Sequence, residues 1–205
     1  MRFPRTLIAA ALLLVPLALP AQAPGDGALP PLSFLGLPAG ASLRQVHQRV
    51  DSLGGRVRCD RARRDRAVLE CRGILTDPDA QVPVELWLSA IDSTAGVMTL
   101  SATLSGVDFD RWRQGLTDRF GQVDARVQGA QWMLQWVRRG RMIRLTWRID
   151  GNSKVASVSL VDGRVLDRWG ADRAARRPAP RAEQPAADSA PPPATPGTTP
   201  GSGQR

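Results

Sequence analysis

The sequence has few of the residues on which enzymes usually depend. His47 is the only histidine, tyrosine is absent, and only two cysteines occur among 205 residues. No G-x-S-x-G motif of serine hydrolases is present. A structural metal site needs more than two ligands, and His47 lies well before the first cysteine on a different predicted element. We therefore expect no enzymatic activity, no cofactor and no metal ion, and we interpret His47 as a partly buried structural residue.

Long apolar runs are also scarce, and the one that stands out is at the start. Residues 6–19 are almost entirely apolar and follow the basic residues Arg2 and Arg5. The run is short and contains a proline, so it is a poor membrane span. Small residues after it are typical of a cleaved export signal. We predict a signal peptide over residues 1–21, cut after Ala21 or else after Ala23, and a periplasmic or extracellular protein.

Lysine is nearly missing, although the chain is strongly basic. The formal net charge is +9, and Lys154 is the only lysine. We interpret this arginine bias first as a coding habit and second as selection for anion binding. A basic charge favours acidic partners, membranes or nucleic acid without choosing among them. No nucleic-acid-binding signature is present, so we expect no nucleic-acid partner, while peripheral membrane contact stays open.

The two cysteines are expected to pair if the chain is exported. Cys59 and Cys71 are equidistant from Asp65. A hairpin that turns near Asp65 would place the two thiols directly opposite each other, on the same side as Val57 and Leu69. A disulfide that closes so short a loop is worth about 3 kcal/mol. A reactive or metal-binding pair is the alternative.

Apolar periodicity divides the middle of the chain into two similar halves. Ser42 and Gln45 form a capping box before the first predicted helix, and Asp108 is the predicted cap of the second. Residues of the two helices correspond at an offset of 66, which indicates an internal duplication. The alternative is that any two amphipathic helices align in this way. The predicted helices are 42–53 and 108–120, and the predicted strands are 56–59, 67–74, 82–90, 97–104, 123–127, 131–137, 142–149 and 155–161.

These elements predict an α+β fold built from two helix-plus-antiparallel-meander units, about α-β4 twice. Each helix would cover one face of its sheet and leave the other face open. Beyond residue 170 the chain is rich in Pro, Ala, Gly, Ser and Thr, which is typical of disorder. The predicted parts are a linker (22–38), a first repeat (39–106), a second repeat (107–170) and a disordered tail (171–205).

The stretch LPAGASLRQVHQRVDSLGG resembles the opening of small bacterial envelope domains of the SmpA/BamE type. The residues that carry the resemblance are Gly40, Ser42, Val46 and Leu53–Gly54. The tandem helix-plus-four-strand pattern over residues 34–169 also resembles the architecture of the secreted beta-lactamase inhibitor protein. Both resemblances imply a non-enzymatic exported domain that binds through a sheet face. SmpA/BamE domains are typically lipid-anchored single copies, whereas this chain has no cysteine near the predicted cut and its helix-plus-strand pattern occurs twice.

The arginine-rich hairpin is the first candidate site. Arg58 and Arg72 would face each other on its outer side, where like charges destabilise a sheet unless an anion lies between them. Arg63 and Arg64 belong to the predicted tip. The hairpin could bind phosphate, lipopolysaccharide or an acidic protein, and the alternative is an ordinary solvated turn.

A second candidate surface lies on the outer sheet faces. Arg144 and Arg148 point outward by their alternation, and so does Trp87, which shares its parity with Glu85 and Ser89. Tryptophan beside arginine is typical of protein-binding hot spots. The alternative is that a loop or the tail covers Trp87. Three other tryptophans are predicted to be core residues: Trp132, Trp136 and Trp147.

The function that these patterns favour is an exported binding module. It would recognise a protein or an anionic envelope component through an open sheet face and the basic disulfide-linked hairpin. Two alternatives stay open, a structural or assembly factor at the bacterial outer membrane and a hydrolase of a type that the motifs do not reveal.

Overall fold

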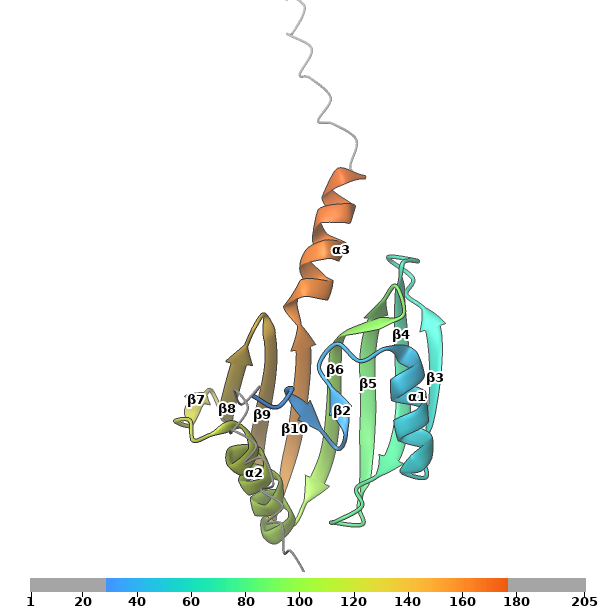
Figure 1. The fold of residues 1–205 in the computed structure, drawn as a ribbon. Helices are drawn as coiled ribbons and strands as arrows, with labels where there is room; N and C mark the ends of the chain where they lie inside the picture. The colour runs from blue at the N-terminus through green and yellow to red at the C-terminus, as the bar shows by residue number, and fades with distance from the viewer. Residues whose placement is uncertain (1–28, 177–205) are drawn as a thin grey trace, which may run out of the picture. The chain divides into compact units, whose positions relative to one another are not determined.

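The structure, a computed structural model, describes residues 29–176 (Figure 1). The predicted signal peptide, residues 22–28 of the predicted linker and the tail beyond residue 176 lie outside the described residues. The helices are α1 (Leu43–Ser52), α2 (Gly106–Phe120) and α3 (Gly163–Ala175). The strands are β1 (Ser33–Phe34), β2 (Leu37–Pro38), β3 (Arg56–Arg61), β4 (Val68–Thr76), β5 (Pro83–Ile91), β6 (Thr94–Leu104), β7 (Arg126–Gln128), β8 (Gln131–Arg138), β9 (Arg141–Asp150) and β10 (Ser153–Asp162).

Eight strands form one antiparallel sheet, in the order β3-β4-β5-β6-β10-β9-β8-β7. The α+β class is therefore confirmed. We had expected a separate sheet for each half, and this was wrong, because β6 and β10 pair along eight residues and join the two meanders. Each of these strands ends its own meander, so pairing removes two edges that would otherwise carry unpaired backbone groups.

The core lies on one face of this sheet. Helices α1 and α2 lie against that face, together with the small β1–β2 pair (Figure 1). Alternate side chains of the long strands are buried beneath them, which is the period-two pattern predicted from the sequence. The fully buried side chains include Leu75, Val84, Leu88, Met98, Leu100, Leu104, Ile143, Leu145 and Leu160.

The two main helices begin differently. Ser42 caps α1, and its side chain and that of Gln45 form the predicted capping box. Helix α2 begins earlier than predicted, because Ser105 rather than Asp108 is its N-cap and accepts from the Asp108 backbone N–H. The Asp108 carboxylate lies in the first turn instead, where it accepts from the Ser105 hydroxyl at 2.6 Å. The two N-caps therefore differ by 63 positions, not 66.

Helix α3 is an element that we did not predict. Asp162 is its N-cap and accepts from the backbone N–H of Arg164. The helix continues to Ala175, so residues 171–175 are helical and the predicted start of the disordered tail was wrong at this boundary. Alanine and arginine are good helix formers, which explains why this alanine-rich segment extends the helix. No helix within residues 29–176 is long and apolar enough to cross a membrane.

Candidate binding surface on the open sheet face

The disulfide that the sequence predicted is present between Cys59 and Cys71. The two residues are directly paired between β3 and β4, with Cα atoms 4.0 Å apart. Cys71 is fully buried on the helix-covered side of the sheet, as its alternation with Val57 and Leu69 indicated. The bond therefore fixes the register of the edge strand β3, and alternate residues of β3 and β4 are directed to the opposite, open face.

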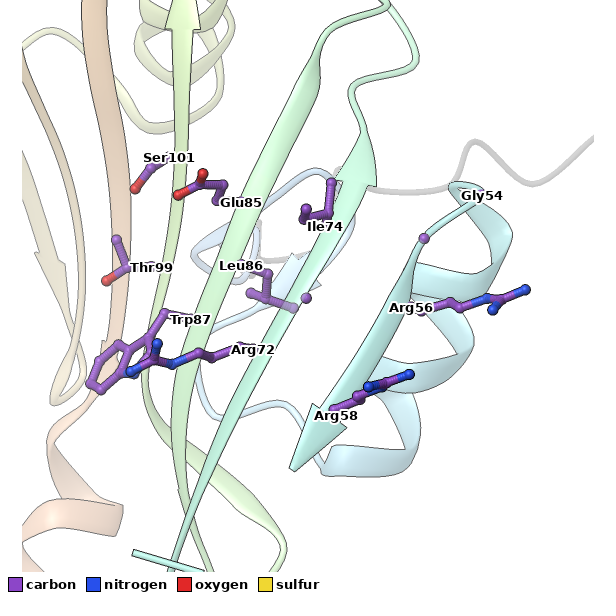
Figure 2. A pocket seen from close by; sticks show the side chains of 12 residues that line it. Gly54, Arg56, Arg58, Arg72, Ile74, Glu85, Leu86, Trp87, Thr99 and Ser101 are labelled. Atoms are coloured by element: carbon purple, nitrogen blue, oxygen red, sulfur yellow. The ribbon is translucent and has the colours of Figure 1, made fainter. Parts of the chain in front are cut away.

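Arg58 and Arg72 are also direct partners across this hairpin. Their side chains diverge, however. Figure 2 shows Arg72 reaching toward Trp87, while Arg58 points away from it. The divergence separates the two like charges, so the hairpin does not require an anion between them.

A continuous row of side chains crosses the open face from this hairpin. Arg72 is paired with Trp87, Trp87 with Thr99, Thr99 with Ser159, and Ser159 with Arg144. Trp87 is 38% exposed, which confirms its outward direction. No loop within the described residues covers it.

Small hydroxyl residues occupy the middle of this face, where the two halves join. Ser101 and Ser157 are hydrogen-bonded at 3.0 Å, and Thr99 and Ser159 at 3.2 Å. Because these side chains are short, they form the floor of a depression on the open face, between Trp87 in the first half and Arg144 in the second. On the tryptophan side the surface forms an open hollow of about 720 Å³ (Figure 2). Its lining includes Arg72, Ile74, Glu85, Trp87, Thr99 and Ser101.

Arg144 and Arg148 lie on the same open face, but each has a partner. The guanidinium of Arg144 donates two hydrogen bonds, of 2.9 and 2.8 Å, to the side-chain oxygen of Gln135. Arg148 lies 3.8 Å from the carboxylate of Asp150, in a pair that is half exposed. The Gln135 contact restricts the Arg144 side chain to a position beside the hydroxyl residues. The Arg148–Asp150 ion pair is long and half exposed, so Arg148 can exchange Asp150 for another carboxylate at little cost in free energy.

Arg63 and Arg64 are not part of this face. They lie in the turn between β3 and β4, at one end of the sheet. The turn is held by Asp65, whose carboxylate accepts from the Ala67 backbone N–H at 3.0 Å and from the indole N–H of Trp169 at 3.0 Å. The predicted site residues therefore divide into an open-face group and a hairpin-tip group.

The Asp65 carboxylate is the acidic group at the hairpin tip, and its neighbours change its pKa. Its pKa lies below the ordinary value of 3.8, first because the Ala67 N–H donates to it and then because the Trp169 indole does. Desolvation opposes this lowering of the pKa, and the positive charges of Arg173 and Arg176 each add a smaller lowering effect. The group is therefore ionised at neutral pH and attaches α3 to the hairpin.

Two carboxylate contacts, in different parts of the fold, were not predicted from the sequence. One is the contact between Asp65 and Trp169, which are 104 residues apart. The other is the role of Asp77, a buried carboxylate that accepts from the Trp112 indole at 2.6 Å and from two backbone N–H groups of its own turn. The sequence signal for Asp77 was its Asp-Pro-Asp turn, which gave no indication of a long-range partner.

Among the other tryptophans, Trp136 is buried, but Trp132 is 43% exposed, so the prediction that Trp132 is a core residue was wrong.

No group of three or more metal-binding side chains occurs within residues 29–176. His47 is partly buried on α1.

Comparison of the chain with family models, curated proteins and solved structures gave no match. The resemblances to SmpA/BamE-type domains and to the beta-lactamase inhibitor protein therefore stay predictions, and the site itself must carry the argument about function.

Proposed function

We propose that this protein is a non-enzymatic binding module that recognises an acidic surface of a partner protein through the open face of its sheet. The observation that carries the proposal is the row of Arg72, Trp87 and Arg144 across that face, with Trp87 exposed beside the hollow. Tryptophan and arginine are the residues most enriched at binding hot spots.

The size of the face suits a protein better than a small molecule. Six long strands lie side by side in the sheet, in the order β4, β5, β6, β10, β9 and β8. They span about 24 Å at the usual strand spacing, and nine residues of strand extend about 30 Å. The product, about 700 Å², is close to the roughly 800 Å² that each partner contributes to a standard interface. The hollow is open to solvent, and small hydroxyl residues occupy the middle of the face, which favours a broad contact over an enclosed ligand.

The open face carries a small excess of positive charge. Arg56, Arg58, Arg72, Arg144 and Arg148 belong to it, against Asp60, Glu70 and Glu85 in the first half and Asp150 in the second. The arginines that flank the hydroxyl residues, Arg72 and Arg144, favour an acidic partner. Glu85 borders the hollow and would disfavour an acidic group directly beside it, so the acidic residues of the partner should meet Arg72 and Arg144 on either side of the hydroxyl floor. Binding should weaken as salt rises.

Site-specific photo-crosslinking tests this proposal in the cell. A photoreactive residue at Thr99, on the floor of the face, should capture a partner, and the same residue at Gln114 on the exposed side of α2 should not. The crosslink should be lost in the variant R58S/R72S/R144S/R148S. It should persist in R111S/R113S/R119S, which removes three arginines of α2. Identical crosslinks in both variants, or capture at Gln114 but not at Thr99, would contradict the proposal.

Export belongs to the same proposal. The Cys59–Cys71 disulfide supports it, since such bonds persist in oxidising compartments. Fractionation of cells that make the native chain checks this point: the protein should be found outside the cytoplasm with both thiols oxidised.

We also infer that the two halves arose by duplication. Each half is a helix followed by a four-stranded meander, and the last strands of the two halves pair antiparallel with both helices on one face. The join is itself nearly symmetric, because Thr99 and Ser101 of one half bond to Ser159 and Ser157 of the other. The difference of 63 between the helix caps then requires that α2 gained a turn at its start.

A further inference from the structure

One end of the sheet collects arginines from two segments that are far apart in the sequence. The β3–β4 turn and α3 lie at this same end (Figure 1). The hydrogen bond from Trp169 to Asp65 joins them. We call the exposed arginines of this end the tip cluster, and its members are Arg61, Arg63, Arg64 and Arg66 of the hairpin and Arg173 and Arg176 of α3.

The tip cluster is largely free of compensating charge. None of its members takes part in an ion pair with the residues that the structure describes. Asp65 lies between the hairpin and helix arginines, and its carboxylate is occupied by the Ala67 and Trp169 donors. Asp92 and Asp172 are the other carboxylates that line the small hollow beside them.

The tip cluster is also held in place before any ligand arrives. The disulfide closes the hairpin two residues before Arg61, and Arg61 donates to the backbone oxygen of Arg66 at 3.2 Å across the turn. On the helix side, the guanidinium of Arg173 lies 5.4 Å from the centre of the Trp169 ring. Fixed positions reduce the entropy that binding must overcome.

The chemistry of the cluster suits phosphate groups presented side by side. Guanidinium groups bind phosphate oxygens through charge-assisted hydrogen bonds. The hollow between the hairpin and α3 measures only about 180 Å³ and is lined by carboxylates as well as arginines, so it is a poor pocket for one anionic ligand. The arginines of both elements are exposed instead, and such an array can meet several headgroups of a charged surface at once.

We propose that the tip cluster docks the protein on the phosphate-bearing headgroups of an anionic lipid surface. This contact is separate from the protein-binding face and goes beyond the function proposed above. The end of a sheet and its face are at right angles, so a molecule that rests on lipid by its tip cluster keeps its open face available to a partner.

Vesicle sedimentation with the full chain tests the proposal. The probes are vesicles of phosphatidylserine mixed with phosphatidylcholine and vesicles of phosphatidylcholine alone. The neutral vesicles control for any apolar contact of the N-terminal segment, which does not depend on lipid charge. We expect binding to the anionic vesicles that falls as salt rises. Each arginine near such a surface contributes about fivefold in affinity, so R63S/R64S/R66S should bind about 100-fold more weakly.

Matched variants separate the cluster from net charge and from the open face. R111S/R113S/R119S removes as many arginines from α2 and should bind the anionic vesicles like the native protein. R63K/R64K/R66K keeps the charge and should retain most of the binding. A far-ultraviolet circular dichroism spectrum of R63S/R64S/R66S that matches the native one shows that its loss of binding is not a failure to fold. R58S/R72S/R144S/R148S should keep vesicle binding even though it loses its partner protein.

Several results would overturn the proposal. These are absence of binding to anionic vesicles, an equal loss in the α2 variant, or loss in the open-face variant. Saturable binding of inorganic phosphate that requires Arg63, Arg64 and Arg66, without vesicle binding, would assign the cluster to a small anion instead. Failure of the crosslinking experiment alone would leave the lipid contact standing, so the two proposals fail separately.

Discussion

Single side chains join parts of this chain that are distant in sequence. Asp77 connects the β4–β5 turn of the first half to Trp112 on α2, and it is only 1% exposed. A buried carboxylate is tolerated here because three N–H groups donate to it. Asp65 has the same role between the hairpin and α3, although it is more accessible.

Replacement of Asp77 by alanine should destabilise the protein by about 2–3 kcal/mol, because it removes charge-assisted hydrogen bonds and leaves the buried Trp112 N–H without a partner. Asp79 is the matched control, since it is exposed in the same turn. Its replacement by alanine should change the free energy of unfolding by less than about 0.5 kcal/mol. Urea unfolding measures both, and equal effects would contradict the role given to Asp77.

The attachment of α3 should depend on acid. The folded pKa of Asp65 is lowered, so its contribution is complete above the ordinary value of 3.8 and is lost as the pH falls through the lower folded value. The indole N–H resonance of Trp169, assigned with Trp169→Phe, should shift only below about pH 4. In Asp65→Asn the resonance should not follow this titration. A transition nearer neutral pH would show that another group controls the contact.

At the scale of elements, the disulfide-linked hairpin and the helix ends decide local stability. Cys59 and Cys71 are 12 residues apart. Replacement of both by serine should cost about 3 kcal/mol, mainly because the unfolded chain gains freedom. The native protein unfolded in a thiol reductant should show a similar loss, and the serine variant should be indifferent to the reductant. An unchanged urea midpoint in both would contradict this estimate.

The α2 cap gives a second check at this scale. Ser105→Ala removes the side chain that accepts from the Asp108 N–H and should cost about 1 kcal/mol. The comparison is Ser52→Ala at the end of α1, whose hydroxyl donates to a carbonyl of its own helix, and this change should cost clearly less. Thermal unfolding followed by circular dichroism distinguishes the two.

Most elements could be predicted from the sequence because their signals are local. Period-two alternation identified the long strands, and the equal spacing of Cys59 and Cys71 from Asp65 gave the hairpin register that the structure has. The cap of α2 was misplaced because Ser105 and Asp108 are both good capping residues, and only the geometry decides between them. Helix α3 was missed because its apolar content is low and its Trp169 is anchored by a residue in the other half of the chain.

At the scale of the whole molecule, the pairing of β6 with β10 makes the two halves one folding unit. This pairing could not be predicted, because the alternation of apolar and polar residues along a strand does not indicate which strand lies next to it in the sheet. The open-face row depends on this pairing, because it brings Trp87 of the first half and Arg144 of the second onto one surface. The sequence predicted which residues point outward but not that they share a face.

Unfolding should accordingly be a single cooperative transition. Separation of the halves would expose β6 and β10 as long edges and uncover buried residues of both meanders. Tryptophan fluorescence and far-ultraviolet circular dichroism should give the same urea midpoint. Two resolved transitions would show that the halves are independent domains.

The position of the disulfide has a consequence for where the molecule can act. In a reducing compartment the two thiols stay separate, the edge strand loses its covalent tie, and the arginines of the turn are carried by a looser loop. The proposed contact with a charged bilayer would then weaken without any change in sequence. If the chain is exported as proposed, oxidation of the cysteine pair would strengthen that contact only after the chain had left the cytoplasm.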